Sequence, residues 1–246
     1  MPHTTSRADL WGLGILIALA LIISVYLLTD TVKTVILNKG QIAVKGYAEK
    51  KITSDYATWE GTLSVHAATL TDAYQKLKNN LEITLNYLKD LGVNEKEIQV
   101  SAVQTTTHYK YTDKGIQTNE VDGYTLRQEV HVHSPDVNRM ASVANQITDL
   151  IQEGIEISSS QPQFFYTQID SLKIQLLGEA AKDALARAQA LAVNSNSLVG
   201  TLRSAHQGVF QITPAFSTTI SDYGENSTST IDKSVKAVIT MEYGLN

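Results

Sequence analysis

The most apolar stretch of the chain runs from Leu10 to Leu28 and contains no charged side chain. A helix of that length spans about 30 Å, close to the hydrocarbon thickness of a bilayer. Within such a helix the backbone N–H and C=O groups bond to one another, as lipid requires. The pattern therefore predicts an N-terminal cytoplasmic tail at 1–9, a transmembrane anchor at 10–28 and a stalk at 29–40.

Two other interpretations compete with an uncleaved anchor. A buried core helix normally keeps a polar face, which this run lacks. A cleaved secretory signal has a basic start, an apolar core of about 7–15 residues and a small-x-small cleavage site. Here Arg7 is the only Lys or Arg before a longer run, and the exit at 25–30 has no small-x-small pair. We favour the uncleaved anchor and keep the cleaved signal as its alternative.

Beyond residue 40, apolar and polar side chains alternate in several stretches, as in strands with one buried face. Tyr56–Ala67 shows this most clearly, with Trp59 and Leu63 among its alternate apolar positions, and Tyr124–His133 follows the same pattern. The segment 112–123 is rich in Gly, Asp and Asn, which predicts a hairpin loop. Further strands are predicted at 41–52, 98–111, 155–168 with a kink near Pro162, 198–212 and 234–243.

Three later stretches switch to the spacing of amphipathic helices. The first two end at a glycine followed by a β-branched residue, where a left-handed backbone is expected. The third carries an alanine stripe that would allow close packing against a neighbour. The three are 71–91, ended by Gly92; 137–151, opened by Ser134-Pro135-Asp136, with Ile147 and Ile151 in its apolar stripe and Gly154 at its end; and 170–193, capped by Asp170 or Ser171.

The order β-β-α-β-β-α-β-α-β-β mixes hairpins with helices, which favours an α+β fold. We predict a mainly antiparallel sheet with three packed helices and a loose internal β-α-β duplication, preceded by the one N-terminal transmembrane helix. This α+β domain occupies 41–246. Within it, Thr213–Lys233 is rich in Ser and Thr, has little to bury, and is predicted to be a flexible loop.

Composition removes several classes of function. The net charge of −5, with no basic cluster longer than Lys50-Lys51, argues against a nucleic-acid partner. The chain has no cysteine, which excludes disulfides and thiolate metal sites. It also lacks a G-x-S-x-G nucleophile elbow and the glycine-rich phosphate-binding motifs.

The remaining candidates for chemistry are a few histidines and carboxylates. His131 and His133 lie on one face of a strand, and Glu129 and His66 would join them only if their strands are neighbours; a closed metal site needs three or four ligands. His206 precedes Gly208, which suggests a bulge or a close backbone approach. Asp55 and Glu60 have ordinary surface explanations. We therefore predict no catalytic, cofactor-binding or metal site, no cofactor, and a protein that is not an enzyme.

Six segments along the chain carry a resemblance to a known family. They are IAVKGYAEK at 42–50, DYATW at 55–59, LKDLGV at 88–93, EIQV at 97–100, SAHQGVFQI at 204–212 and EYGL at 242–245. These segments, in this order over about 40–245, resemble the SIMPL-domain family of bacterial envelope proteins.

This resemblance implies an envelope location, ring-like or channel-like homo-oligomers, an association with oxidative-stress defence, and no catalytic residues. Lys33, Lys39 and Lys45 outnumber Arg7, which alone would favour a cytoplasmic domain. This count is weak evidence, because long domains cross the membrane largely regardless of such charges. Membership of the family favours the opposite orientation, with the domain outside the cytoplasm. We expect a single-pass inner-membrane protein with a periplasmic domain that self-assembles in a structural or stress-protective role, its protein partner unknown. The alternative is a monomeric ligand- or partner-binding module.

Overall fold

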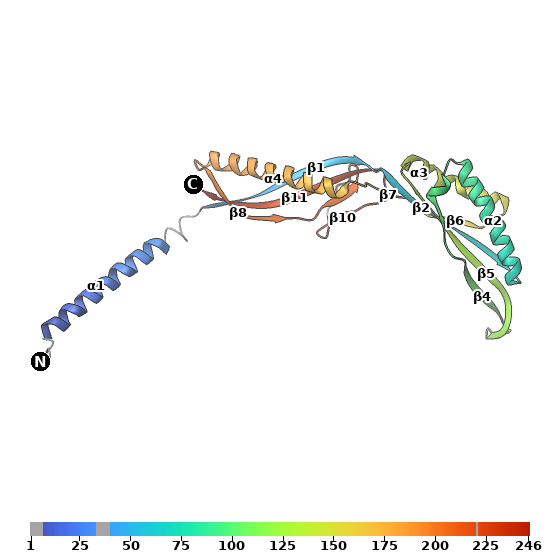
Figure 1. Ribbon diagram of the computed structural model, residues 1–246, viewed down its shortest axis with the longest axis horizontal. Coiled ribbons are helices and arrows are strands. Elements are labelled where there is room, and N and C mark those ends of the chain that lie inside the picture. The colour runs from blue at the N-terminus through green and yellow to red at the C-terminus, as the bar shows by residue number, and fades with distance from the viewer. Residues whose placement is uncertain (1–6, 33–39, 220) are drawn as a thin grey trace. The chain divides into compact units, whose positions relative to one another are not determined.

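The computed structural model describes residues 7–32, 40–219 and 221–246 (Figure 1). Its described part is an α+β structure with four α-helices and two mostly antiparallel sheets. The class and the three packed helices were predicted, but the strands lie in two sheets and are more numerous than predicted. The elements are α1 (Arg7–Val32), β1 (Gln41–Thr53), β2 (Tyr56–Ala67), α2 (Leu70–Asp90), the 3-10 turn η2 (Glu95–Glu97), β3 (Ile98–Val100), β4 (Gln104–Tyr111), β5 (Gln117–Ser134), α3 (Val137–Gln146), the 3-10 helix η3 (Ile147–Glu153), β6 (Ile157–Ser159), β7 (Gln163–Phe165), α4 (Ile169–Asn194), β8 (Val199–Gln207), β9 (Gln211–Pro214), β10 (Glu225–Asn226) and β11 (Asp232–Leu245).

Helix α1 contains the predicted anchor. Its side chains are described from Leu16 to Thr29, and they are exposed. Among the described residues, no helix was found that is long and apolar enough to cross a membrane. Most of the predicted tail at 1–9 and of the predicted stalk at 29–40 lies outside the described residues. Within the predicted anchor at 10–28, side chains are described only from Leu16 onward.

The chain forms two compact units. The described residues of 1–47, 177–208 and 238–246 belong to the first unit, and 48–176 and 209–237 belong to the second. No linker-like stretch of the sequence marks this division, because its boundaries fall inside β1, α4 and β11 and between β8 and β9.

In the first unit, α4 packs along β1 and β11, with β8 antiparallel to β11 (Figure 1). The alanine stripe of α4 forms the contact, as predicted. At Gly46 of β1, a Cβ atom would lie 2.0 Å from the carbonyl oxygen of Ala180 and 2.7 Å from Cβ of Ala184, so only glycine fits. The buried alanines, each at most 1% exposed, are Ala180, Ala184, Ala188 and Ala192.

A carboxylate of α4 also bonds to β1. The backbone N–H of Tyr47 donates to Oδ2 of Asp183 at 2.8 Å, and Nε of Arg187 donates to the same oxygen at 2.7 Å. These two donors, the backbone N–H first, lower the pKa of Asp183. Strand and helix are thus joined by a charge-assisted hydrogen bond as well as by small-residue packing.

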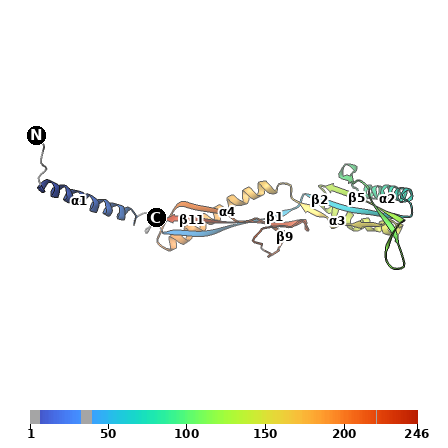
Figure 2. The same cartoon turned by 90° about the horizontal axis from the view of Figure 1, so that it is seen from below.

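The second unit contains a sheet in the order β3-β5-β2-β6, with neighbouring strands antiparallel. Its two central strands, β2 and β5, are labelled in Figure 2 together with α2 and α3. Strand β2 leads through α2 to β3, which pairs with β5; β5 leads through α3 to β6, which pairs with β2. This is the β-α-β-β-α-β arrangement with two split β-α-β units, also called ferredoxin-like. These two units correspond to the two segments of the loose β-α-β repeat that the sequence predicts.

The buried face of this sheet is the one that the alternation predicts. Trp59 and Leu63 of β2 are at most 2% exposed, and so are Leu126, Val130 and Val132 of β5. Together with buried side chains of α2 and α3 they form one continuous core.

Helix α2 and the 3-10 helix η3 of this core end in the same way. Gly92 and Gly154 have φ of +85° and +81°, so each supplies the predicted left-handed residue. The N–H of Val93 then donates to the carbonyl of Leu88, and the N–H of Ile155 donates to that of Leu150, at 3.0 and 3.1 Å. These are the six-to-one bonds of a Schellman motif, and they turn the chain toward the next strand.

Three predicted strands are each divided in two. In 98–111 the break after β3 occurs where Ser101 bonds sideways: its Oγ accepts from the N–H of Glu129, and its carbonyl accepts from the side chain of Gln128. In 155–168 the break contains Pro162, the predicted kink, which has no N–H to donate. In 198–212 the strand stops at Gly208, whose N–H donates to the carbonyl of Val238 at 2.9 Å.

Other predicted boundaries were wrong. Strand β5 begins at Gln117, because the hairpin loop is only a short turn closed by the N–H of Thr112 donating to Ile116 O. Ile151 is 54% exposed and Leu150 is buried instead, since η3 is a 3-10 helix and places Ile147 and Leu150 on one face. Helix α4 begins before the predicted caps Asp170 and Ser171, at Ile169.

The segment 213–233 is more closely bonded than its composition suggests. It contains the end of β9, all of β10 and the start of β11. Backbone bonds join the N–H of Ser227 to Ile212 O, the N–H of Phe164 to Thr228 O, and the N–H of Ser54 to Ile231 O. The flexibility of this segment stays a prediction.

The approach of α4 to β1 can be tested with Gly46→Ala. The added methyl group would meet backbone atoms of α4, and such overpacking costs about 1–3 kcal/mol. We expect a lower free energy of unfolding by urea. The matched control is Gly178→Ala, because a Cβ atom there meets nothing within 4 Å. It should stabilise α4 by about 0.5–1 kcal/mol. Equal effects of the two substitutions would contradict the packing described.

Candidate functional site

His131 lies between two carboxylates. Its Nδ1 is 3.7 Å from Oε2 of Glu60, directly opposite on β2, and its Nε2 is 3.4 Å from Oε2 of Glu129 on β5. The three side chains are between 32% and 47% exposed, so solvent screens their charges. His133 lies on the same face, and together with His131 and Glu60 it lines an open groove of about 260 Å³.

His66 is too far along β2 to join this group. It lies opposite Thr125, whereas Glu60 lies opposite His131, six positions away, which is about 20 Å at the rise of a strand. Its Nδ1 bonds to Oγ1 of Thr125 at 3.2 Å, and its ring meets that of His108 edge-on at 5.5 Å. The neighbouring strands therefore do not bring the four candidate ligands together. In the described ranges, no group of three or more His, Asp or Glu residues could hold a metal ion.

The other candidates have structural surroundings. His206 is exposed on β8 opposite Thr240. At Gly208 a Cβ atom would lie 2.9 Å from the carbonyl oxygen of Val238, so the backbones approach closely as predicted. Both carboxylate oxygens of Asp55 accept bonds of 2.7 Å from Thr167, one from its N–H and one from its hydroxyl.

A residue that was not among the candidates, Lys233, lies at the most unusual position. It is the second residue of β11, and only 2% of it is exposed. Its Nζ donates to the carbonyl oxygen of Phe164 in β7. No carboxylate of the described residues lies within ion-pairing distance of this ammonium group. Burial without a counter-ion lowers the pKa of Lys233.

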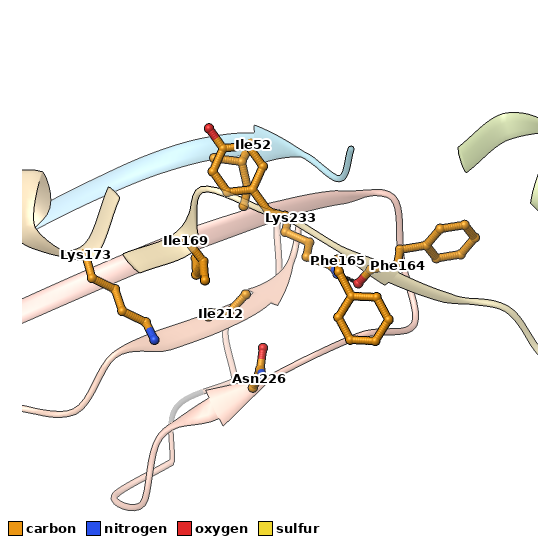
Figure 3. A pocket seen from close by; sticks show the side chains of 9 residues that line it. Ile52, Phe164, Phe165, Ile169, Lys173, Ile212, Asn226 and Lys233 are labelled. Atoms are coloured by element: carbon orange, nitrogen blue, oxygen red, sulfur yellow. Dashed lines mark hydrogen bonds between the residues drawn. The ribbon is translucent and has the colours of Figure 1, made fainter. Parts of the chain in front are cut away.

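Lys233 lines a hollow of about 100 Å³, drawn in Figure 3. Side chains from β1, β7, α4, β9, β10 and β11 surround it, all within the second unit. Its polar lining comes from Lys233, Lys173 and Asn226. Its apolar lining comes from Ile52, Phe164, Phe165, Ile169 and Ile212, and Tyr166 completes the wall.

The sequence does contain a signal for Lys233. Val235, Ala237, Ile239, Met241 and Tyr243 form the buried face of the last strand, and Lys233 has the same parity. Its place at the end of the Ser/Thr-rich segment hides this signal, because lysines are common in polar loops. The continuation of β11 to Asp232 places it on the buried side.

Comparison with known families finds one match over most of the chain. Residues 42–243 match the family model described as SIMPL, protein of unknown function (DUF541). No curated protein matches the chain.

The burial of Lys233 predicts a pH dependence of stability. Its pKa in the folded protein lies below the ordinary 10.5. Between these two values the unfolded chain binds more protons than the folded one, so the free energy of unfolding should rise with pH there. We expect Lys233→Met to flatten this rise in urea unfolding between pH 7 and 10. Lys76→Met, at an exposed position of α2, should keep the wild-type slope. A variant of Lys233 with an unchanged slope would contradict the assignment.

Proposed function

The chain belongs to the SIMPL family, and from this premise we propose that it is a non-enzymatic, membrane-anchored protein of the cell envelope. In this proposal its SIMPL domain faces the periplasm and assembles into homo-oligomers with a structural or stress-protective role. The observation that carries the assembly is the pair of long strands, β1 and β8, each of which pairs with β11 alone among the described strands.

The edges of that sheet support assembly. Among the described strands, β1 and β8 each pair with β11 alone. They are 13 and 9 residues long, and strands of this length at a sheet edge are templates for pairing with another chain. Apolar side chains accompany the edge, with Leu202 of β8 49% exposed. Pairing of β1 in one copy with β8 in the next is a head-to-tail contact, which closes into a ring when the rotation allows.

The apolar surface of α1 supports anchoring. Leu16, Ile22 and Tyr26 are 70%, 68% and 73% exposed, and the apolar side chains leave no polar face. A helix that is apolar all round is stable where lipid or protein covers it. Anchoring would confine the domains to a plane and raise their effective concentration, which favours weak edge-to-edge contacts.

The surroundings of the candidate side chains support a non-enzymatic role. His131 and its two carboxylates form a solvent-screened surface group, and Asp55 holds a turn through Thr167. Nucleophilic catalysis would require a nucleophile in hydrogen-bonding contact with a base that a third group orients. The candidate histidines and carboxylates do not form such a set.

Anchoring predicts that the full-length protein remains in the membrane fraction after washing at alkaline pH, and that a chain lacking residues 1–38 is released. Intact mass should show that residues 1–38 are retained. A protease added to spheroplasts should digest the domain while a cytoplasmic control protein survives. Protection of the domain until the cells are lysed would contradict the orientation, and a shortened N-terminus would favour the cleaved signal.

Assembly predicts a large, discrete mass for the full-length protein in detergent, constant across a concentration series in light scattering. One chain has a mass of 26.9 kDa. Leu202→Lys places a charge on the edge of β8 and should lower the mass, because charged edges resist pairing. Leu70→Lys, at a residue of similar exposure (46%) in α2, is the control and should leave the mass unchanged. A mass near one chain at every concentration would overturn the assembly and favour the monomeric binding module.

A further inference from the structure

The hollow beside Lys233 has the composition of a binding site, and we propose that it binds a small carboxylate with a short aliphatic tail. This inference concerns only the second unit. It holds whether the protein assembles or remains a monomer.

The charge of Lys233 is the first part of the argument. An ammonium group has three donors, and here the bond to the carbonyl of Phe164 is the one that its described surroundings supply. A buried charge is costly unless it is paired and hydrogen-bonded. A carboxylate in the hollow would supply both the opposite charge and acceptors for the remaining donors.

The carboxylates described around the hollow do not act as the counter-ion of Lys233. Lys173, which also lines it, is 3.6 Å from Asp170, whose side chain is 93% exposed. The Oδ1 of Asp232 accepts from the hydroxyl of Thr53 at 2.8 Å. Glu225 lines a neighbouring hollow rather than this one. The carboxylates near the site therefore have other positions or partners, and the two lysines give the hollow a positive charge.

A further polar side chain lines the hollow. Asn226 of β10 lines it with its side-chain amide, and β10 is held in place by its parallel pairing with β9 and by the bond from the N–H of Ser227 to Ile212 O. An ammonium and an amide on fixed strands can hold the two oxygens of a carboxylate in a defined orientation.

Size and polarity select the rest of the ligand. Three isoleucines from three elements, Ile52, Ile169 and Ile212, contribute to the walls. A dry cavity of about 150 Å³ holds benzene, so the volume of about 100 Å³ suits a carboxylate with one to three carbons in its tail. Inorganic phosphate fits less well, because its other oxygens would face apolar walls without hydrogen bonds.

The test uses full-length protein in detergent and sodium propionate as the probe. Binding is followed by thermal unfolding and by the methyl resonances of labelled isoleucines, with sodium chloride at equal ionic strength as the reference. We expect a saturable rise in the unfolding temperature, with the largest shifts at the methyl groups of Ile52, Ile169 and Ile212.

Variants locate the anion. Lys233→Met keeps the length of the side chain and removes its charge, and it should weaken propionate binding by about tenfold or more, as expected for loss of a buried charged partner. Lys51→Met is the matched control: Lys51 lines the adjoining hollow with Ile52 and Lys233 but not this one, and the variant should bind as the wild type does. The isoleucine shifts of the wild-type protein provide a result that does not depend on the folding of either variant.

Three results would overturn the proposal. The first is propionate binding that Lys233→Met leaves unchanged. The second is phosphate binding as tight as that of propionate, which would make the site a general anion site. The third is a set of methyl shifts that avoids the three isoleucines of the hollow. The mass of the assembly does not enter any of these results, so failure of the assembly and failure of this site are distinguishable.

Discussion

The second unit depends on the pairing of β2 with β5. Their ladder runs from Ala57 opposite Ser134 to Ala67 opposite Tyr124 without interruption. A slip of one residue would turn the whole buried set, including Trp59, toward solvent. The same strand β2 also holds β7 and sets Phe164 opposite Ala57. The carbonyl that receives the ammonium of Lys233 is thus placed by the register of a sheet to which Lys233 itself does not belong.

Much of this unit could be predicted from the sequence, because apolar and polar side chains alternate along β2 and most of β5, and because α2 and η3 end at left-handed glycines. The ends of β2 were predicted to the residue. The breaks after β3 and β8 could not be predicted, since they depend on long-range partners: Gln128 and Glu129 for Ser101, and Val238 for Gly208. The exchange of Ile151 for Leu150 follows from a local change of helix type, which hydrophobic spacing of 3.6 residues cannot reveal.

The candidate site was harder to predict than the fold. The histidines were candidates because of their residue type. Sequence spacing cannot show that Glu60 and Glu129 lie on both sides of His131, or that His66 lies six positions along β2 from Glu60. Lys233 was hidden for the opposite reason. Its parity matched the buried face of the last strand, but its neighbour Asp232 and the Ser/Thr-rich residues before it resembled the end of a polar loop. A lysine in phase with a buried strand is therefore a more useful signal than two exposed histidines.

Trp59 gives this architecture an optical consequence. Its indole is 2% exposed, and Nε1 donates at 2.9 Å to the hydroxyl of Ser159, which in turn donates at 2.8 Å to the carbonyl of Ala144. The chain has only one other tryptophan, Trp11 in α1. A dry, hydrogen-bonded indole emits at a shorter wavelength than one in water. With Trp11 replaced by phenylalanine, the wavelength of the fluorescence emission would therefore report on Trp59 alone, and so on the packing of β2 against β6 and α3.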